Sequence, residues 1–257
     1  MKSYGLEKIK SFWDRKPCGT MGEIPPVIDL SYFNRISRRR YCLEPFIKEC
    51  AEFEIHKGEK ILEVGCGVGS DGVEFAKAGA NYTAIDVSEQ SLILAEKNFE
   101  LNDLRGKFVL GSAENMPFKD GEFDFIYSWG VIHHTPNIDK AISEIHRVLK
   151  PGGKMVIMIY HWPSLVCFQI WLVYSLLKAR PFSSIRKLMA EHHESPGTQV
   201  YAAGEAKKLF KDFRDVKIKT IVTPYDARFG RNKFLPRFFQ KLIPPSLGFF
   251  MVIEGKT

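Results

Sequence analysis

The stretch Lys60–Val87, KILEVGCGVGSDGVEFAKAGANYTAIDV, determines the fold of this chain. It begins with a short apolar run that is typical of a buried strand in a parallel sheet. Residues 65–69 then form a glycine-rich turn, and Ser70 or Asp71 can cap a helix that Gly79 ends. A second apolar run follows directly. The stretch therefore predicts a strand–turn–helix–strand unit of an α/β protein.

Two carboxylates, Glu63 and Asp86, stand at the ends of the two strands of this unit. Open α/β sheets bind their ligands at that edge. Asp86 suits the ribose hydroxyls of a dinucleotide and of S-adenosylmethionine equally. Glu63 separates the two ligands, because an anion repels a pyrophosphate but attracts the ammonium and sulfonium groups of S-adenosylmethionine. We therefore predict S-adenosylmethionine as the cofactor, with a nicotinamide dinucleotide, and thus an oxidoreductase, as the alternative.

The spacing of the glycines, taken together with Glu63, resembles a known family motif. The turn reads G-x-G-x-G, and Ser70 stands where a dinucleotide fingerprint has its third Gly or Ala. With Glu63 in front, the turn resembles the motif E/D-x-G-x-G-x-G of class I S-adenosylmethionine-dependent methyltransferases. The resemblance is strong over residues 60–160. It points to the small-molecule branch that includes the ubiquinone- and menaquinone-biosynthesis methyltransferases.

This resemblance implies a Rossmann-like α/β fold with a seven-stranded, mostly parallel sheet. It further implies the strand order 3-2-1-4-5-7-6, an antiparallel strand seven, and helices on both faces. The apolar pattern predicts three more strands at Lys107–Leu110, Phe123–Tyr127 and Lys154–Tyr160, and an amphipathic helix at Ile138–Leu149. Candidates for strands six and seven are Asp215–Val222 and Leu247–Ile253.

The resemblance also implies which residues bind the cofactor, at the tips of the first four strands. Glu114 would accept from the adenine amino group and the Ala113 amide would donate to the adenine ring. Trp129 would face the sulfonium, which an aromatic ring attracts by about 0.5–2 kcal/mol. The complete predicted set is Glu63, Gly65, Cys66, Gly67, Gly69, Asp86, Val87, Ala113, Glu114, Ser128 and Trp129.

The rest of the chain extends this core on both sides. We expect residues 1–57 to form a helical extension or lid over the cofactor, including a helix over Pro45–Phe53; an ordinary packing extension is the alternative. Residues 58–257 would form the methyltransferase domain, with a helical cap inserted at about 161–200 and a second insertion at about 224–246. With 45% apolar residues, the chain can bury one substantial core.

The composition limits which classes of binding partner and which cellular compartment we expect. The net charge of +7 suits an anionic substrate, an anionic membrane surface or nucleic acid, and does not choose among them. No NPPY-type tetrapeptide or RNA-binding appendage is recognisable, so we expect no nucleic-acid partner and keep a nucleic-acid methyltransferase as an alternative. Five cysteines without a CxxC pair and a polar N-terminus indicate a cytoplasmic protein. The oligomeric state is not determined.

Methyl transfer requires alignment of nucleophile, methyl group and sulfur, which contributes roughly 7–11 kcal/mol. A base is needed only for a hydroxyl or a protonated amine. The candidates for this base are His134, His133, Tyr160 and His161, with His134 first by position. In the cap, His192 and His193 are candidates to contact the substrate. We predict no metal, because neither histidine pair has the i,i+4 spacing of a helical metal site. A non-catalytic binding protein of the same fold is a further alternative.

Two unusual segments lie outside the predicted sheet. Ser164–Leu177, SLVCFQIWLVYSLL, is apolar nearly all round but too short to span a bilayer. Lys233–Ile243 mixes basic and aromatic residues. Together they favour either a cap over an apolar substrate or a patch in peripheral contact with a membrane, and a cap helix docked on the sheet is the alternative. We therefore expect methylation of an O or N atom in a small apolar or amphiphilic acceptor.

Overall fold

A computed structural model of the chain describes residues 5–20, 24–229, 233–234 and 240–257. Its main sheet consists of β1 (Lys60–Val64), β2 (Asn81–Asp86), β3 (Lys107–Leu110), β4 (Phe123–Trp129), β5 (Leu149–Tyr160), β6 (Arg214–Ile221) and β9 (Phe250–Lys256). A separate ribbon pairs β7 (Arg228–Phe229) with β8 (Lys233–Phe234).

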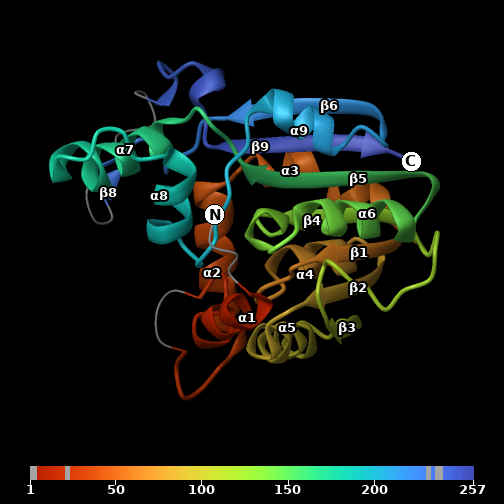
Figure 1. The fold of residues 1–257 in the computed structure, drawn as a ribbon. Helices are drawn as coiled ribbons and strands as arrows, with labels where there is room; N and C mark the ends of the chain where they lie inside the picture. Colours follow the sequence, from red (N-terminus) through yellow and green to blue (C-terminus); the bar gives the residue numbers. More distant parts are fainter. Residues whose placement is uncertain (1–4, 21–23, 230–232, 235–239) are drawn as a thin grey trace.

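The strand order confirms the predicted fold class. It is β3-β2-β1-β4-β5-β9-β6, in which β6 and β9 are the sixth and seventh strands of the prediction (Figure 1). The neighbours from β3 to β5 are parallel, whereas β9 is antiparallel to both β5 and β6. The carboxyl ends of β1, β2 and β4 therefore meet at one edge of the sheet, where the predicted ligand site lies.

Helices surround this sheet. Those within the core are α4 (Ser70–Lys77), α5 (Glu89–Leu101), α6 (Ile138–Val148) and α9 (Ala203–Leu209). Those before the core are α1 (Leu6–Arg15), α2 (Leu30–Leu43), α3 (Ile47–Ala51) and the short η1 (Phe53–His56). The others are η2 (Ile132–His134), α7 (Leu165–Tyr174), η3 (Leu176–Lys178), α8 (Ile185–His192) and η4 (Pro245–Leu247). Figure 1 shows α1 next to α5, and α7 with α8 together to one side of the sheet.

The central strands are apolar without alternation because both of their faces are covered. On β1, Ile61 packs in a cluster with Phe75 of α4, while the next residue, Leu62, packs in a second cluster with Ile145 of α6. Both β1 side chains are fully buried. A strand that buries alternate residues against helices on opposite faces must be apolar at successive positions.

The glycine turn after β1 uses backbone conformations that other residues adopt only with strain. Gly65, Gly67 and Gly69 have φ angles of 79°, 53° and 74°. The α4 helix begins directly after Gly69, and no side chain caps its first turn. The predicted cap by Ser70 or Asp71 is therefore wrong. Asp71 is buried and instead accepts hydrogen bonds from side chains of other elements.

The region before the core contains a helix that the apolar pattern did not predict. The α2 helix begins after Asp29, whose Oδ1 accepts from the Tyr32 N–H at 2.8 Å, an N-cap contact. It ends before Pro45, because a proline disfavours helical backbone in the residue that precedes it. Residues 38–40 thus lie within a helix. The predicted helix over Pro45–Phe53 is shorter, as α3 followed by η1.

In the described residues, the two predicted insertions consist of short helices and one short β-ribbon. Residues 161–200 contain α7, η3 and α8, and residues 224–246 contain the β7–β8 ribbon and the start of η4. Positions 235–239 of the predicted basic and aromatic segment lie outside the described residues. The domain division itself stays a prediction.

Substitution of Gly65 tests the packing of the turn. A Cβ at Gly65 would collide with Val131, whereas Gly152 has nearly the same φ, 77°, and no neighbour within 4 Å of a Cβ. Each Gly→Ala change should cost roughly 1–2 kcal/mol for the left-handed backbone. The collision should add about 1–3 kcal/mol to the Gly65→Ala loss alone. Chemical denaturation measures both free energies, and equal losses in the two variants would contradict this packing.

Candidate functional site

A cavity of about 110 Å³ lies at the carboxyl ends of β1, β2 and β4. Its walls come from the glycine turn, the β2 tip, the loop after β3 and the β4 tip, and from helices α1 and α2. The lining includes Leu6, Ile9, Trp13, Arg40, Glu63, Gly65, Cys66, Gly67, Asp71, Asp86, Val87, Ala113, Trp129, Val131 and His134. Segments from before and within the predicted core thus enclose one space.

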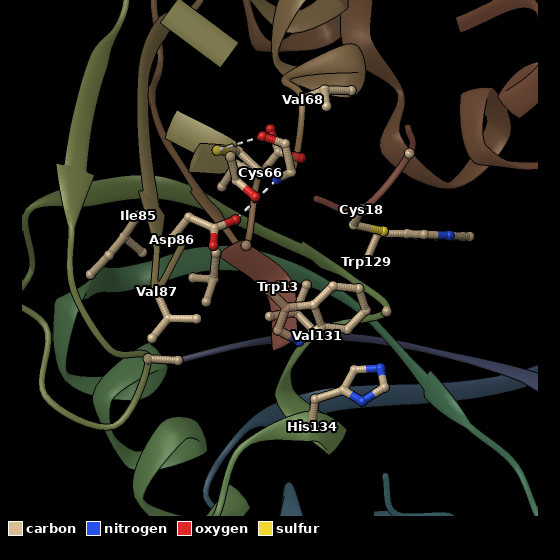
Figure 2. Close-up of a pocket in the computed structure, with 18 of the residues that line it drawn as sticks. Trp13, Cys18, Cys66, Val68, Ile85, Asp86, Val87, Trp129, Val131 and His134 are labelled. Carbon is tan, nitrogen blue, oxygen red and sulfur yellow. Dashed lines mark hydrogen bonds between the residues drawn. The ribbon is translucent and has the colours of Figure 1, made fainter. Parts of the chain in front are cut away.

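The carboxylate of Asp86 connects the glycine turn to the tip of β2. Its Oδ2 accepts from the Gly67 N–H at 3.0 Å, and its Oδ1 accepts from the Ser88 N–H at 2.9 Å. Figure 2 shows this carboxylate pointing toward the turn beside Cys66. Burial raises the pKa of the Asp86 carboxyl to about 6, although the N–H donors oppose the shift. Asp86 is therefore mainly ionised at neutral pH and can accept hydroxyl donors.

Glu63 is buried at the end of β1, where its Oε2 accepts from the Tyr82 hydroxyl at 2.5 Å. Burial, and after it the nearby Asp71 carboxylate, raise the pKa of the Glu63 carboxyl well above its usual range. A cation placed beside Glu63 would favour its ionised form, whereas an anionic phosphate would be repelled. The site therefore suits a cationic ligand group at this position.

An ion pair between the partly buried Arg40 and the buried Asp71 attaches α2 to the core. Arg40 donates to both oxygens of Asp71, from Nε at 2.9 Å and from a terminal guanidinium nitrogen at 2.5 Å. The hydroxyls of Tyr41 and Tyr127 donate to the same carboxylate at 2.9 and 3.0 Å. Such bidentate, fully satisfied pairs fix geometry strongly. Sequence reasoning did not identify Arg40 as a cavity residue, although Arg40 stands in the basic run 38–40.

Two aromatic side chains form the opposite part of the cavity. The Trp129 indole N–H donates to the buried Glu44 carboxylate at 2.9 Å, which fixes its ring at the β4 tip. Trp13 of α1 lies with its ring centroid 5.4 Å from that of His134, edge to face. Figure 2 shows the Trp13 and His134 rings close together. The Phe12–Trp13 pair was visible in the sequence, but nothing there placed it beside His134.

His134 connects the β4 tip to the segment after α8. Its Nδ1 lies 2.8 Å from the Ser195 hydroxyl and 3.1 Å from the Thr198 hydroxyl. Its Nε2 lies 3.3 Å from a Glu194 carboxylate oxygen, which also accepts from the Tyr160 hydroxyl at 2.7 Å. Partial burial would raise the pKa of Glu194, but His134, His193 and Tyr160 lower it to about 2. An ionised carboxylate therefore faces the imidazole.

The structure brings about half of the predicted site residues into the cavity lining. Those that line it are Glu63, Gly65, Cys66, Gly67, Asp86, Val87, Ala113, Trp129 and His134. Those outside the lining are Gly69, Glu114, Ser128, His133, Tyr160, His161, His192 and His193.

The predicted residues outside the lining have other contacts. The Ser128 hydroxyl donates to the Val64 carbonyl at 3.1 Å, and Glu114 accepts from the Asn137 N–H at 2.7 Å. His161 Nδ1 lies 3.0 Å from the Gly248 carbonyl oxygen, and the exposed His192 stacks on Tyr174 with centroids 4.0 Å apart.

His133 is fully buried, with its ring 4.0 Å from that of Tyr160 and 4.2 Å from that of His134. Neither of its ring nitrogens has a hydrogen-bond partner in the described part of the chain. Burial lowers the pKa of His133 well below its usual value. In this environment His133 is a neutral side chain.

A second cavity adjoins the first and shares Ile9, His134 and Thr135 with it. It has a volume of about 710 Å³ and lies between the β4 tip and the segment 184–201, which includes α8. Its remaining lining residues are Pro136, Ser184, Arg186, Lys187, Ala190, Glu191, Gly197, Thr198, Gln199, Val200 and Tyr201. His134 therefore stands where the two cavities meet.

Comparison with known proteins agrees with the geometry of the first cavity. Residues 62–157 match the family model described as a methyltransferase domain. This segment is therefore similar to a class I methyltransferase domain. A relative named sterol 24-C-methyltransferase ERG6B, from Gibberella zeae, is 41% identical over 113 residues, which is 42% of this chain and 29% of the relative. One named phosphoethanolamine N-methyltransferase 2, from Caenorhabditis elegans, is 34% identical over 116 residues, or 44% and 26% of the two chains.

Solved structures share the fold of the methyltransferase domain beyond its matched segment. The S-adenosylmethionine-dependent methyltransferase from Aquifex aeolicus superposes with a TM-score of 0.54 at 18% identity. That superposition covers 90% of this chain and 99% of the Aquifex protein. At this level of identity the likeness concerns the fold alone.

S-adenosyl-L-methionine is the cofactor of this class, and the first cavity fits it. Asp86 can accept ribose hydroxyls, and Glu63 with the Trp129 ring can hold the cationic methionyl end. At Gly67 a Cβ would lie 3.1 Å from the Cys18 carbonyl, so the turn leaves room only for backbone. Among the described residues, no group of three or more His, Cys, Asp or Glu could hold a metal ion.

The raised pKa of Asp86 predicts a pH dependence of cofactor binding. The native state holds this proton up to about pH 6, well above the ordinary value near 3.9, and the ribose hydroxyls prefer the ionised carboxylate. Binding should therefore release a proton, and affinity should rise with pH from about 5 to 6 and level off above 7. Fluorescence of Trp13 and Trp129, which line the cavity, measures the affinity.

The variant Asp86→Asn should bind the cofactor more weakly. The part of the pH dependence of affinity that arises from Asp86 should disappear in this variant. Any dependence that remains in the variant reports Glu63, whose pKa is also raised. An identical slope in the native protein and in Asp86→Asn would contradict the assignment to Asp86.

Proposed function

We propose that this protein transfers the methyl group of S-adenosylmethionine to an O or N atom of a small apolar or amphiphilic acceptor. The carrying observation is the pair of strand-end carboxylates, Glu63 and Asp86, that flank the glycine turn in one cavity. A cytoplasmic location belongs to the same proposal. Of the rival functions, neither a nicotinamide-dependent oxidoreductase nor a nucleic-acid methyltransferase is supported by the relatives described above.

The residues of the first cavity would bind and orient the cofactor. Asp86 would hold the ribose and Glu63 the ammonium, with Trp129 against the sulfonium. When bound, the cofactor supplies a methyl group already activated by its positive sulfur. The chain then has to align the acceptor and exclude water. Leu6, Ile9 and Trp13 of α1 would cover the cavity as the lid expected for residues 1–57.

The second cavity would hold the acceptor. Its common border with the first cavity is formed by Ile9, His134 and Thr135, so an acceptor there would reach the methyl group past His134. A hydroxyl or protonated amine would lose its proton to Nδ1 of His134 through the Thr198 hydroxyl, which lines this cavity and lies 3.1 Å from Nδ1. The ionised Glu194, 3.3 Å from Nε2, would stabilise the resulting imidazolium. Tyr160 would position Glu194 through its hydroxyl.

A carbon acceptor is the second candidate. Among the relatives, one is named for methylation of a sterol carbon and the other for methylation of a nitrogen. The match to each covers under a third of the relative, so their substrates support only the general class. A carbon acceptor still requires a proton to leave after methylation, and His134 is again the nearest candidate base at the border of the two cavities.

A methyl-transfer screen tests the proposed function. The protein would be incubated with S-adenosylmethionine carrying a deuterated methyl group and with metabolite and lipid extracts. Mass spectrometry should find an acceptor that gains one labelled methyl group, most readily in the apolar or amphiphilic fraction. Cofactor binding without any transfer across both fractions would contradict catalysis and favour the non-catalytic binding protein.

Substitution of His134 tests its role with the acceptor found by the screen. His134→Ala should lower kcat by about 10²–10⁴-fold, because general base catalysis contributes that factor. Cofactor affinity should stay within a few-fold, since cofactor binding is assigned to other residues. The control is His146→Ala, whose ring packs on Phe213 at the α6 face away from both cavities. Unchanged turnover in His134→Ala would exclude His134 as the base and leave Tyr160 and His161 as the candidates for that role.

A further inference from the structure

The segment from α7 to Phe182 exposes an apolar patch, defined here as Phe168, Val173, Leu176, Leu177 and Phe182. The exposed fractions of these side chains are 51%, 47%, 44%, 72% and 100%. Within the fully described α7, only Val166 and Cys167 are buried. A helix that is apolar on all sides normally requires an apolar environment on all sides. The patch therefore needs a partner surface.

The exposed segment is held in a defined conformation. The Trp171 indole N–H donates to the Pro181 carbonyl at 3.2 Å, and the Ser175 and Ser183 hydroxyls both donate to the Arg180 carbonyl. These bonds fold residues 175–183 back onto α7. Phe182 consequently projects from an anchored turn.

The charge next to the patch is mainly positive. Residues 161–190 contain four basic residues, Lys178, Arg180, Arg186 and Lys187, and no acidic residue. Arg186 is paired with Glu205, which leaves the charges of Lys178, Arg180 and Lys187 beside the patch. We propose that the apolar patch and these basic residues form a docking surface for an anionic lipid bilayer. Apolar side chains that enter the interface beside Lys and Arg are typical of peripheral membrane attachment. None of the helices in the described part of the chain is long and apolar enough to cross a bilayer.

A second copy of the chain fits this surface less well. A two-fold symmetric interface places the same residues on both sides, so Lys178, Arg180 and Lys187 would face the same three positive charges of the other copy. Opposite charge on a lipid headgroup layer removes that repulsion. The charge pattern thus favours the bilayer over self-association.

The docking surface is close to the proposed acceptor cavity. The α7 helix packs against α8, and α8 contributes Arg186, Lys187, Ala190 and Glu191 to the lining of the second cavity. Figure 1 shows α7 at the outer side of the molecule with α8 next to it. Docking would bring that cavity near the lipid, where an amphiphilic acceptor is concentrated. This consequence rests on the proposed function; the docking itself does not.

Vesicle binding tests the docking surface without any methyl transfer. The full chain would be mixed with phosphatidylcholine vesicles containing 30% phosphatidylglycerol, or none, and separated by flotation. Binding should require phosphatidylglycerol and should fall at least tenfold in 0.5 M salt, because the charges act through a screened field. Leu177→Glu/Phe182→Glu should weaken binding at least tenfold, and because both side chains are well exposed the variant should keep its thermal stability.

The matched control is Ile55→Glu/Ile93→Glu, which makes the same change at apolar residues that are 58% and 52% exposed elsewhere. This control should bind like the native chain. No binding by the native chain, or equal losses in both double variants, would overturn the proposal. The native chain could instead fail to bind vesicles and form a dimer, as measured by light scattering. If Leu177→Glu/Phe182→Glu abolished that dimer, the surface would be assigned to a second copy of the chain.

Discussion

The backbone of the turn after β1 is the constraint on which the rest of the structure depends. Three glycines in left-handed conformations let the chain reverse from a buried strand into α4 within five residues. The reversal leaves the Gly67 N–H directed at the Asp86 carboxylate, so the tips of β1 and β2 are joined by one hydrogen bond. The same turn leaves no room for a Cβ at Gly65, where Val131 of the β4 tip packs. Three strand ends are thereby held around one cavity.

The helices that close the cavity come from outside the segment that matches the family model. The family match covers residues 62–157, whereas Trp13 and Arg40 come from α1 and α2. Arg40 reaches the core through its two hydrogen bonds to Asp71. Asp71 is buried, whereas the Arg40 side chain is 23% exposed, so removal of Arg40 should cost less than the roughly 3–5 kcal/mol typical of a fully buried pair. Residues within the matched segment and residues before it thus enclose the same cavity.

The sequence predicted the helices and strands whose apolar side chains recur at the spacing of a buried helix or strand face. The β3 bounds, the strand order and the amphipathic α6 followed from apolar periodicity and the resemblance. Periodicity could not reveal that Asp71 pairs with Arg40, because the two residues are 31 positions apart and their contact depends on how α2 docks. For the same reason, the contact between the Trp13 and His134 rings could not be predicted from the sequence. Local sequence patterns predict helices and strands. Contacts between segments that are distant in the sequence depend on how those helices and strands pack.

The proposed function depends on binding of S-adenosylmethionine in the cavity between Glu63 and Asp86. Isothermal titration calorimetry of the full chain at pH 7.5 measures this binding, with a nicotinamide dinucleotide as the competing ligand. We expect one S-adenosylmethionine per chain, at least tenfold weaker binding in Asp86→Ala, and native affinity in Asp212→Ala, because Asp212 is an exposed acid that does not line the cavity. Binding of the dinucleotide with none of S-adenosylmethionine would contradict it.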